Sequence, residues 1–192
     1  TQDMDLLWDT RPKLRMFTTD EIDSKGLISI LKKADRSFDL IDKQRFRAVN
    51  RSGYMVDLVK PEPNHLLKKA KRQMGDKDDL MAAEIRNLHW LISAPKFSRV
   101  VIGDDGYPAT MAAPDPRAFA VHKLWLSRQL DRDPLKKTRD YSQALAVSRI
   151  ILQYMPDLQL EPEQLRMFPK TLVTEAVKAF QASELPPGYG DI

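Results

Sequence analysis

The sequence contains no cysteine, which excludes disulfide bonds, thiolate-bound zinc, iron–sulfur clusters and a cysteine nucleophile. This absence favours a protein of a reducing compartment, and we expect the cytoplasm. No apolar run approaches the roughly 18 residues that a membrane-spanning helix needs. The first residues, TQDMDLLWDTR, lack the basic-then-apolar order of a signal peptide. We therefore expect an unexported protein with no membrane partner.

A large excess of charge of either sign is also missing. The chain of 192 residues has 31 basic and 27 acidic side chains, for a net charge of +4. This mild surplus suits phosphate-rich partners but does not by itself predict nucleic-acid binding. The hydrophobic content of 42% is near that of globular proteins and excludes a disordered chain. The length fits one domain, or one domain with a helical appendage.

The first half of the chain alternates predicted strands with short helices. Residues 3–8 are short and apolar enough for a strand, and residues 24–34 have the apolar spacing of a short helix. Two β-prone runs, 46–49 and 54–59, are joined by a turn in which Gly53 permits a positive φ, so they predict a hairpin. Further strands are predicted at residues 88–93, 99–102 and 107–112.

After Pro114 the pattern changes to helices. Asp115-Pro116 and Asp133-Pro134 each place a capping acid before a proline at the first helical position, which predicts helices of about four and six turns. A third helical stretch is predicted at residues 163–183, interrupted at Pro169. These patterns predict two regions, an α/β (α+β) region over residues 1–114 and a helical region over residues 115–192.

Three aspartates stand out within the predicted strands. Asp3 and Asp5 share one face because side chains alternate along a strand. Asp57 lies among apolar strand residues, where a carboxylate is costly to bury unless it is paired or binds metal. If the two strands are neighbours, the carboxylates converge into an oxygen-rich site that suits Mg²⁺ bound jointly with substrate phosphates. Two ions about 4 Å apart would activate an attacking hydroxyl and stabilise a leaving pyrophosphate.

These residues resemble a known superfamily. TQDMDL at the start and Asp57 within GYMVDLVKP resemble the Asp-x-Asp and third-aspartate motifs of the DNA polymerase β-like nucleotidyltransferases. The Thr-x-Asp-hydrophobic-Asp form is typical of bacterial branches, including abortive-infection-type toxins. AAPDPRAFAVHKL and KKTRDYSQA, further along the chain, are similar to motifs of one bacterial nucleotidyltransferase-fold family. The resemblance covers roughly residues 1–150 and implies a mixed sheet followed by a C-terminal helical region.

The resemblance also implies roles for individual residues. Asp3 and Asp5 would bind both of the Mg²⁺ ions expected with a bound NTP. Asp57 would bind the catalytic ion and orient or deprotonate the acceptor hydroxyl. Lys123 would approach the nucleotide phosphates. Lys137, or equally Lys136, would match the lysine of the second helical motif, with Asp140 following it, and Lys137 is the second residue expected to bind the nucleotide.

One superfamily motif has no counterpart in this sequence. Members place a Gly-Ser pair at a helix N-terminus upstream of the Asp-x-Asp strand, where it holds the triphosphate. The sequence begins at Thr1, so we expect the first strand and helix of the fold to be missing from it and to belong to a longer chain. The alternative is that the protein lacks this phosphate-binding element.

Simpler interpretations exist for each feature. Paired acids on a strand often mark a solvated edge, and His122-Lys123 would face water on an amphipathic helix. Asp140 would then be only a helical-spacing partner of Lys137 or Lys136. At the level of function, the main expectation is Mg²⁺-dependent transfer of a nucleoside monophosphate from an NTP to a hydroxyl of a protein, an RNA or a small molecule. The alternative is a catalytically degenerate module, or a toxin component, that binds nucleotide, nucleic acid or a partner protein such as an antitoxin.

Overall fold

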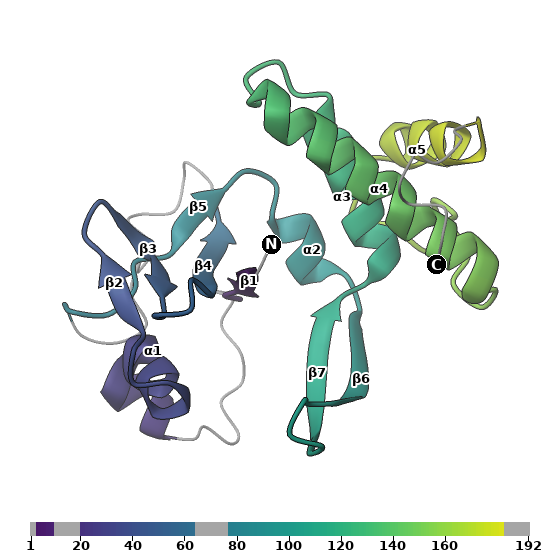
Figure 1. Cartoon of the computed structure of the whole chain (residues 1–192). Coiled ribbons are helices and arrows are strands. Elements are labelled where there is room, and N and C mark those ends of the chain that lie inside the picture. The colour runs from purple at the N-terminus through teal and green to yellow at the C-terminus, as the bar shows by residue number, and fades with distance from the viewer. Residues whose placement is uncertain (1–2, 10–19, 64–76, 183–192) are drawn as a thin grey trace. The chain divides into compact units, whose positions relative to one another are not determined.

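A computed structural model of the chain describes residues 3–9, 20–63 and 77–182. The chain divides into two compact units, Thr1–His89 and Trp90–Ile192, here called the sheet unit and the helical unit (Figure 1). The boundary between the two units lies between His89 and Trp90, and thus precedes Pro114, after which the sequence pattern changes to helices. The Trp90 ring packs against Trp125 and Phe168 at centroid distances of 5.2 and 4.9 Å. Trp90 therefore belongs with the helices that follow it.

The sheet unit is built on one mixed sheet with strand order β1-β4-β3-β2, and β5 also pairs with β4. β1 runs parallel to β4, while β3 runs antiparallel to it. This confirms the expected mixed sheet. The strands are β1 (Asp3–Leu7), β2 (Asp39–Ile41), β3 (Gln44–Val49), β4 (Met55–Pro61) and β5 (Ala83–Ile85).

The predicted hairpin is confirmed as β3 and β4. Asn50 closes the turn, because its side-chain Oδ1 accepts the Tyr54 N–H at 2.8 Å and its carbonyl accepts the Gly53 N–H at 3.0 Å. Gly53 has a φ of +81°, a conformation that side chains with a Cβ rarely adopt. The turn fixes the register of the hairpin, in which Val49 lies opposite Met55.

The hydrophobic core of the sheet unit lies on one face of the sheet. Val56 and Leu58 of β4 are buried there, and α1 (Asp20–Ala34) packs Leu27, Ile28 and Leu31 against the same cluster. The helix is broken at Gly26, where φ is +69°. Asp79 accepts the N–H groups of Leu27 at 3.0 Å and Ile28 at 2.9 Å, so it caps the segment that follows the break.

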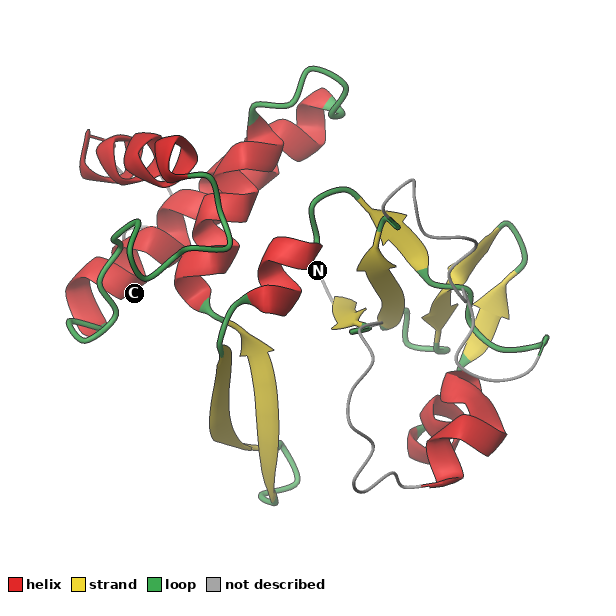
Figure 2. Ribbon diagram, turned by 180° about the vertical axis from the view of Figure 1, so that it is seen from behind, coloured by secondary structure: helices red, strands yellow, loops and turns green. Residues whose placement is uncertain are grey.

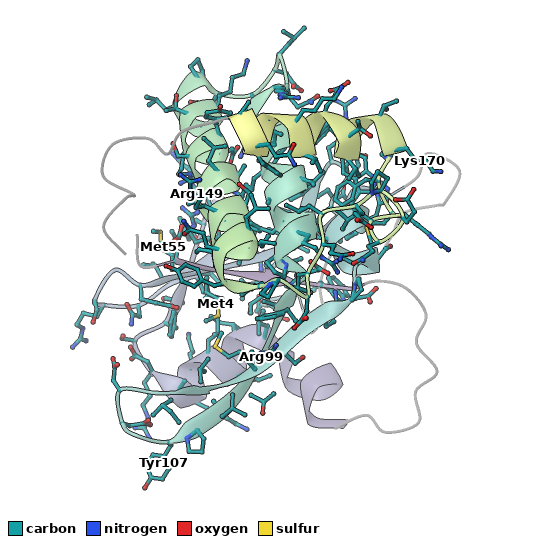
Figure 3. All side chains as sticks on the ribbon, turned by 90° about the vertical axis from the view of Figure 1, so that its right-hand side faces the viewer. Met4, Met55, Arg99, Tyr107, Arg149 and Lys170 are labelled. Atoms are coloured by element: carbon teal, nitrogen blue, oxygen red, sulfur yellow. The ribbon has the colours of Figure 1, made fainter. Side chains whose placement is uncertain are left out.

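The first element of the helical unit differs from the prediction. Residues 88–93 were predicted as a strand, but α2 (His89–Ser93) is a short helix whose Trp90, Leu91 and Ile92 are all buried. Its three apolar residues are consecutive, and so short a run has no period that separates helix from strand. The next two predicted strands are confirmed as the antiparallel pair β6 (Lys96–Ile102) and β7 (Pro108–Pro114). Figure 3 shows Tyr107 at the tip of this hairpin and Arg99 along β6.

Three longer helices complete the helical unit (Figure 2). They are α3 (Pro116–Ser127), α4 (Pro134–Tyr154) and α5 (Lys170–Ala182). The predicted caps are confirmed, since Asp115 accepts the Arg117 N–H and Asp133 accepts the Leu135 N–H, each at 2.8 Å. The third helix begins only after Pro169, so the helical start predicted at residue 163 was wrong. In the described part of the chain, no helix has both the length and the apolar character to cross a membrane.

Candidate functional site

Two acids and one arginine form a row across three adjacent strands of the sheet unit. Asp5 of β1 lies opposite Asp57 of β4, and Asp57 lies opposite Arg47 of β3. Asp3 precedes Asp5 by two residues and therefore shares its face. This face, carrying Asp3, Asp5 and Asp57, is here called the acidic face. It lies opposite the face that β4 packs into the core.

Asp57 is held by a two-pronged ion pair. Arg47 Nε donates to Asp57 Oδ1 at 2.6 Å, and Arg47 Nη2 donates to Asp57 Oδ2 at 2.6 Å. Only 11% of the Asp57 side chain is exposed, against 26% of Arg47. A planar guanidinium matches both oxygens of a carboxylate at once. The ion pair with Arg47 therefore explains how Asp57, which is flanked by apolar strand residues, can be buried.

The charges of the acidic face act on the arginine. The hydrogen-bonded Asp57 carboxylate raises the pKa of Arg47, and the charges of Asp57, Asp3 and Asp5 raise it further against the opposing effect of burial. All three carboxylates therefore stabilise the charged guanidinium. Asp3 and Asp5 themselves are exposed, so this end of the acidic face is open to solvent and to ligands.

The acidic face has the donor chemistry of a magnesium site. Carboxylate oxygens are the ligands of hard divalent cations, and three carboxylates stand on one face of two paired strands. Both oxygens of Asp57 are bonded to Arg47 in this conformation. Within residues 3–9, 20–63 and 77–182, no three His, Asp or Glu side chains are arranged so that they could hold an ion. The residue types fit a divalent cation, but an ion bound at Asp57 would have to share or replace the arginine.

Arg47 is the residue that the sequence interpretation missed. The predicted hairpin came within one residue of it, because a four-residue turn at residues 50–53 would place residue 47 opposite residue 56, whereas the observed register, with Val49 opposite Met55, places Arg47 opposite Asp57. A buried acid in one strand with a basic residue opposite it predicts a cross-strand ion pair.

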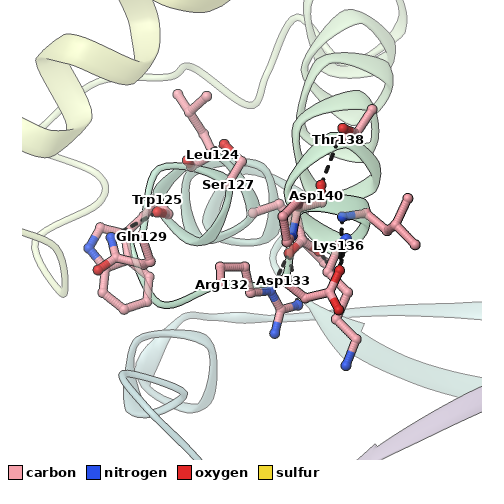
Figure 4. Close-up of polar contacts among 12 residues, drawn as sticks. Leu124, Trp125, Ser127, Gln129, Arg132, Asp133, Lys136, Thr138 and Asp140 are labelled. Carbon is pink, nitrogen blue, oxygen red and sulfur yellow. Dashed lines mark hydrogen bonds and ion pairs between the residues drawn. The ribbon is translucent and has the colours of Figure 1, made fainter.

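Asp140, in the helical unit, has unexpected partners (Figure 4). Asp140 was interpreted as a possible surface partner of Lys136 or Lys137, and this was wrong. Its side chain is fully buried, and its carboxylate accepts hydrogen bonds from Lys123 Nζ and Arg132 Nε, each at 2.9 Å. Asp140 lies on the buried side of α4, where it meets α3 and the loop between the two helices.

The two candidate phosphate-binding lysines differ in their surroundings. Lys123 is paired with Asp140, and its side chain is only 17% exposed. Lys137 donates to the carbonyl of Leu130 at 3.5 Å and is half-buried. The structure therefore pairs Lys123 with Asp140, whereas the hydrogen bond of Lys137 goes to a backbone carbonyl. Both lysines belong to the helical unit, whereas the acidic face belongs to the sheet unit.

Comparison with known proteins gives one result. A family model described as nucleotidyltransferase matches residues 1–166, which include the acidic face as well as α3 and α4. No curated protein and no solved structure gives a significant match to this chain.

Proposed function

The chain belongs to a nucleotidyltransferase family, and from this premise we propose that its acidic face carries out Mg²⁺-dependent transfer of a nucleoside monophosphate from an NTP to a hydroxyl acceptor. The family supports nucleotidyl transfer in general; the metal, the site residues and the acceptor are the proposal. The observation that carries it is the register of β1 and β4, which sets Asp5 beside Asp57 and puts Asp3 on the same face.

Charge balance supports the need for a cation. Three carboxylates and the triphosphate of an NTP are all anionic, and Arg47 supplies one positive charge to this face. Like charges at short range repel strongly where water is partly excluded. Mg²⁺ is the cation that most often joins protein carboxylates to nucleotide phosphates. When bound, it would polarise the α-phosphate and lower the pKa of the acceptor hydroxyl.

Each residue of the acidic face then has a defined task. Asp3 and Asp5, exposed at the open end, would hold the cation together with the phosphates. Asp57 would orient the acceptor hydroxyl and take up its proton. The acceptor oxygen forms a bond to the α-phosphorus, the bond to the β-phosphate bridging oxygen breaks, and pyrophosphate leaves. Proteins, RNA ends and small molecules all supply such hydroxyls, so all three are candidate acceptors.

Titration calorimetry of the full-length protein tests this proposal. Each of the four NTPs is titrated with and without Mg²⁺ into the wild type, Asp57→Asn and Asp39→Asn. Asp39 is a matched control because it lies in the same sheet, on β2, with 81% of its side chain exposed. We expect Mg²⁺-dependent binding in the wild type and in Asp39→Asn, and a loss of roughly tenfold or more in Asp57→Asn. Binding that ignores both the metal and Asp57→Asn would overturn the proposal.

A second candidate, a binding module without catalysis, is favoured by one observation. Both oxygens of Asp57 are bonded to Arg47, as they would be in a site that has lost its metal. Incubation with α-³²P-labelled NTP and separate pools of protein, RNA and small hydroxyl compounds separates the candidates. Label transfer that requires Asp57 supports the enzyme, while tight NTP binding without any transfer supports the module.

A further inference from the structure

We propose that Arg47 is a positioning residue that competes with a divalent cation for Asp57. In this view the guanidinium holds the carboxylate in place while no metal is bound, and it gives up at least one oxygen when a cation binds. This inference rests on the proposed function, because it assumes that the acidic face takes a metal ion. It adds a residue outside the three aspartates that sets the affinity for that ion.

The geometry provides the first step of the argument. Two of the three guanidinium nitrogens donate to Asp57, both at 2.6 Å, while Nη1 points to Gln44 Oε1 at 3.5 Å. The Arg47 side chain therefore directs its strongest bonds at Asp57. Because Nε and Nη2 each take one oxygen, neither oxygen of the carboxylate lacks a guanidinium hydrogen bond.

Electrostatics provide the second step. A carboxylate with 11% of its side chain exposed needs a counter-charge, and Asp5 stands beside it as a like charge in the paired strand. Arg47 neutralises part of this acidic face. A divalent cation at Asp57 would deliver the same neutralisation, but it would repel the guanidinium at short range. The two cations are therefore alternative partners for one carboxylate.

The surroundings of Arg47 provide the third step. About a quarter of its side chain is exposed, so the guanidinium has a path toward solvent. Its carbon Cζ lies 5.6 Å from the centre of the Phe46 ring, at the outer limit of a cation–π contact. Gln44 and Phe46 lie on the same strand and form only weak contacts with the head group. Hence Asp57 is the main contact that fixes Arg47, and a metal that takes Asp57 would release it.

The experiment measures Mn²⁺ binding without nucleotide, by electron paramagnetic resonance of the free ion. It compares the wild type with Arg47→Met, Arg47→Lys and Arg51→Met. Arg51 is the matched control, since it lies in the exposed turn of the same hairpin and its loss removes the same charge. We expect Arg47→Met to bind Mn²⁺ on the order of tenfold more tightly than the wild type, equivalent to about 1.4 kcal/mol. Arg47→Lys should gain less, and Arg51→Met should stay within about twofold.

Thermal unfolding supplies a second readout and a check on folding. Arg47→Met leaves Asp57 buried without its counter-charge, so its melting temperature should fall without metal and should rise more on Mn²⁺ addition than that of the wild type. The double variant Arg47→Met/Asp57→Asn should recover part of the lost melting temperature without gaining Mn²⁺ affinity. If Arg47→Met does not fold, Arg47→Lys decides the matter, since its affinity must exceed that of the wild type.

The outcomes separate this inference from the proposed function. If the wild type binds Mn²⁺ through Asp57 but Arg47→Met binds no more tightly than Arg51→Met, the competition is wrong and the metal site stands. If neither the wild type nor any variant binds Mn²⁺, or if Asp57→Asn binds as the wild type does, the metal site itself fails. The inference then fails with it.

Discussion

Asp57 in the sheet unit and Asp140 in the helical unit are both buried beside basic side chains, but the two aspartates differ in the charge around them. Asp57 in the sheet unit has one arginine and shares its face with Asp3 and Asp5, so negative charge is in surplus. Asp140 in the helical unit has Lys123 and Arg132, so positive charge is in surplus. Excess negative charge at a solvent-exposed face favours the binding of a cation. A fully buried carboxylate that is paired with two basic side chains instead connects secondary-structure elements.

Burial sharpens this contrast. The Asp140 side chain has no exposed surface and links α3 and the loop after it to α4. The Asp57 pair joins only neighbouring strands that the sheet already holds together. We therefore propose a chemical role for Asp57 and a stabilising role for Asp140.

The largest expected effect is on catalysis by Asp57. Asp57→Asn should lower the rate of pyrophosphate release by about 10³-fold, because it removes the group that orients the hydroxyl and accepts its proton. The melting temperature should change little, since the amide still accepts one bond from Arg47. The rate is measured with whichever acceptor pool supports the fastest wild-type turnover. An unchanged rate would remove Asp57 from the chemistry.

Asp140→Asn should have the opposite profile. It leaves two cations with little exposure facing a neutral amide, and we expect the free energy of unfolding to fall by about 3 kcal/mol. Urea unfolding followed by tryptophan fluorescence reports on this unit through Trp90 and Trp125. Asp157→Asn, at an exposed turn position, is the control and should change the stability by less than about 0.5 kcal/mol. A stable Asp140→Asn protein with weakened NTP binding would reverse the assignment.

The two lysines offer a smaller test of the same contrast. If Lys137 contacts phosphate, Lys137→Met should weaken NTP binding roughly tenfold and leave unfolding almost unchanged. Lys123→Met should mainly lower the stability, because it removes a partner of the enclosed Asp140. Calorimetry and urea unfolding of both variants check this. Equal losses of NTP affinity would mean that Lys123 also reaches the nucleotide.

The smallest expected effect is on the stability of the Asp35→Asn variant, which serves as a reference for the variants of Asp57 and Asp140. Hydrogen bonds from the Ser37 N–H and hydroxyl, with further help from Asn50, lower the pKa of Asp35. A pKa that is lower in the folded state adds stability above the unfolded value of about 3.9, and this stability is lost as the pH falls through the folded value. Asp35→Asn should therefore be slightly less stable than the wild type at pH 7, and the difference should shrink near pH 3. A difference that does not depend on pH would exclude this charge effect.

Local signals in the sequence predicted much of the fold. The β3–β4 hairpin was predicted from Gly53 and the alternation around it, and the starts of α3 and α4 were predicted from Asp115 and Asp133, because turns and caps depend on a few consecutive residues. The short strands β2 and β5 were missed, since three residues show no period. The short apolar run at α2 was assigned to the wrong class for a related reason.

The candidate site was predictable only in part. The sequence pattern placed Asp3 and Asp5 on one face and Asp57 on a second strand, but the pairing of β1 with β4 joins segments about 50 residues apart. Such non-local contacts leave no local period to detect. Arg47 lies in the predicted hairpin, but the predicted turn gives a register one residue away from its pairing with Asp57. The partners of Asp140 depend on how α3 and α4 pack.

The central claim is that the acidic face of the sheet unit binds an NTP through a divalent cation. Backbone amide resonances of the ¹⁵N-labelled protein, recorded while Mn²⁺ and an NTP are added together, test it most directly, because the paramagnetic ion broadens the signals of nearby nuclei. We predict broadening first at Asp3, Asp5 and Asp57, with none of these signals affected in Asp57→Asn. Broadening confined to the helical unit, with β1 and β4 unchanged, would contradict the account.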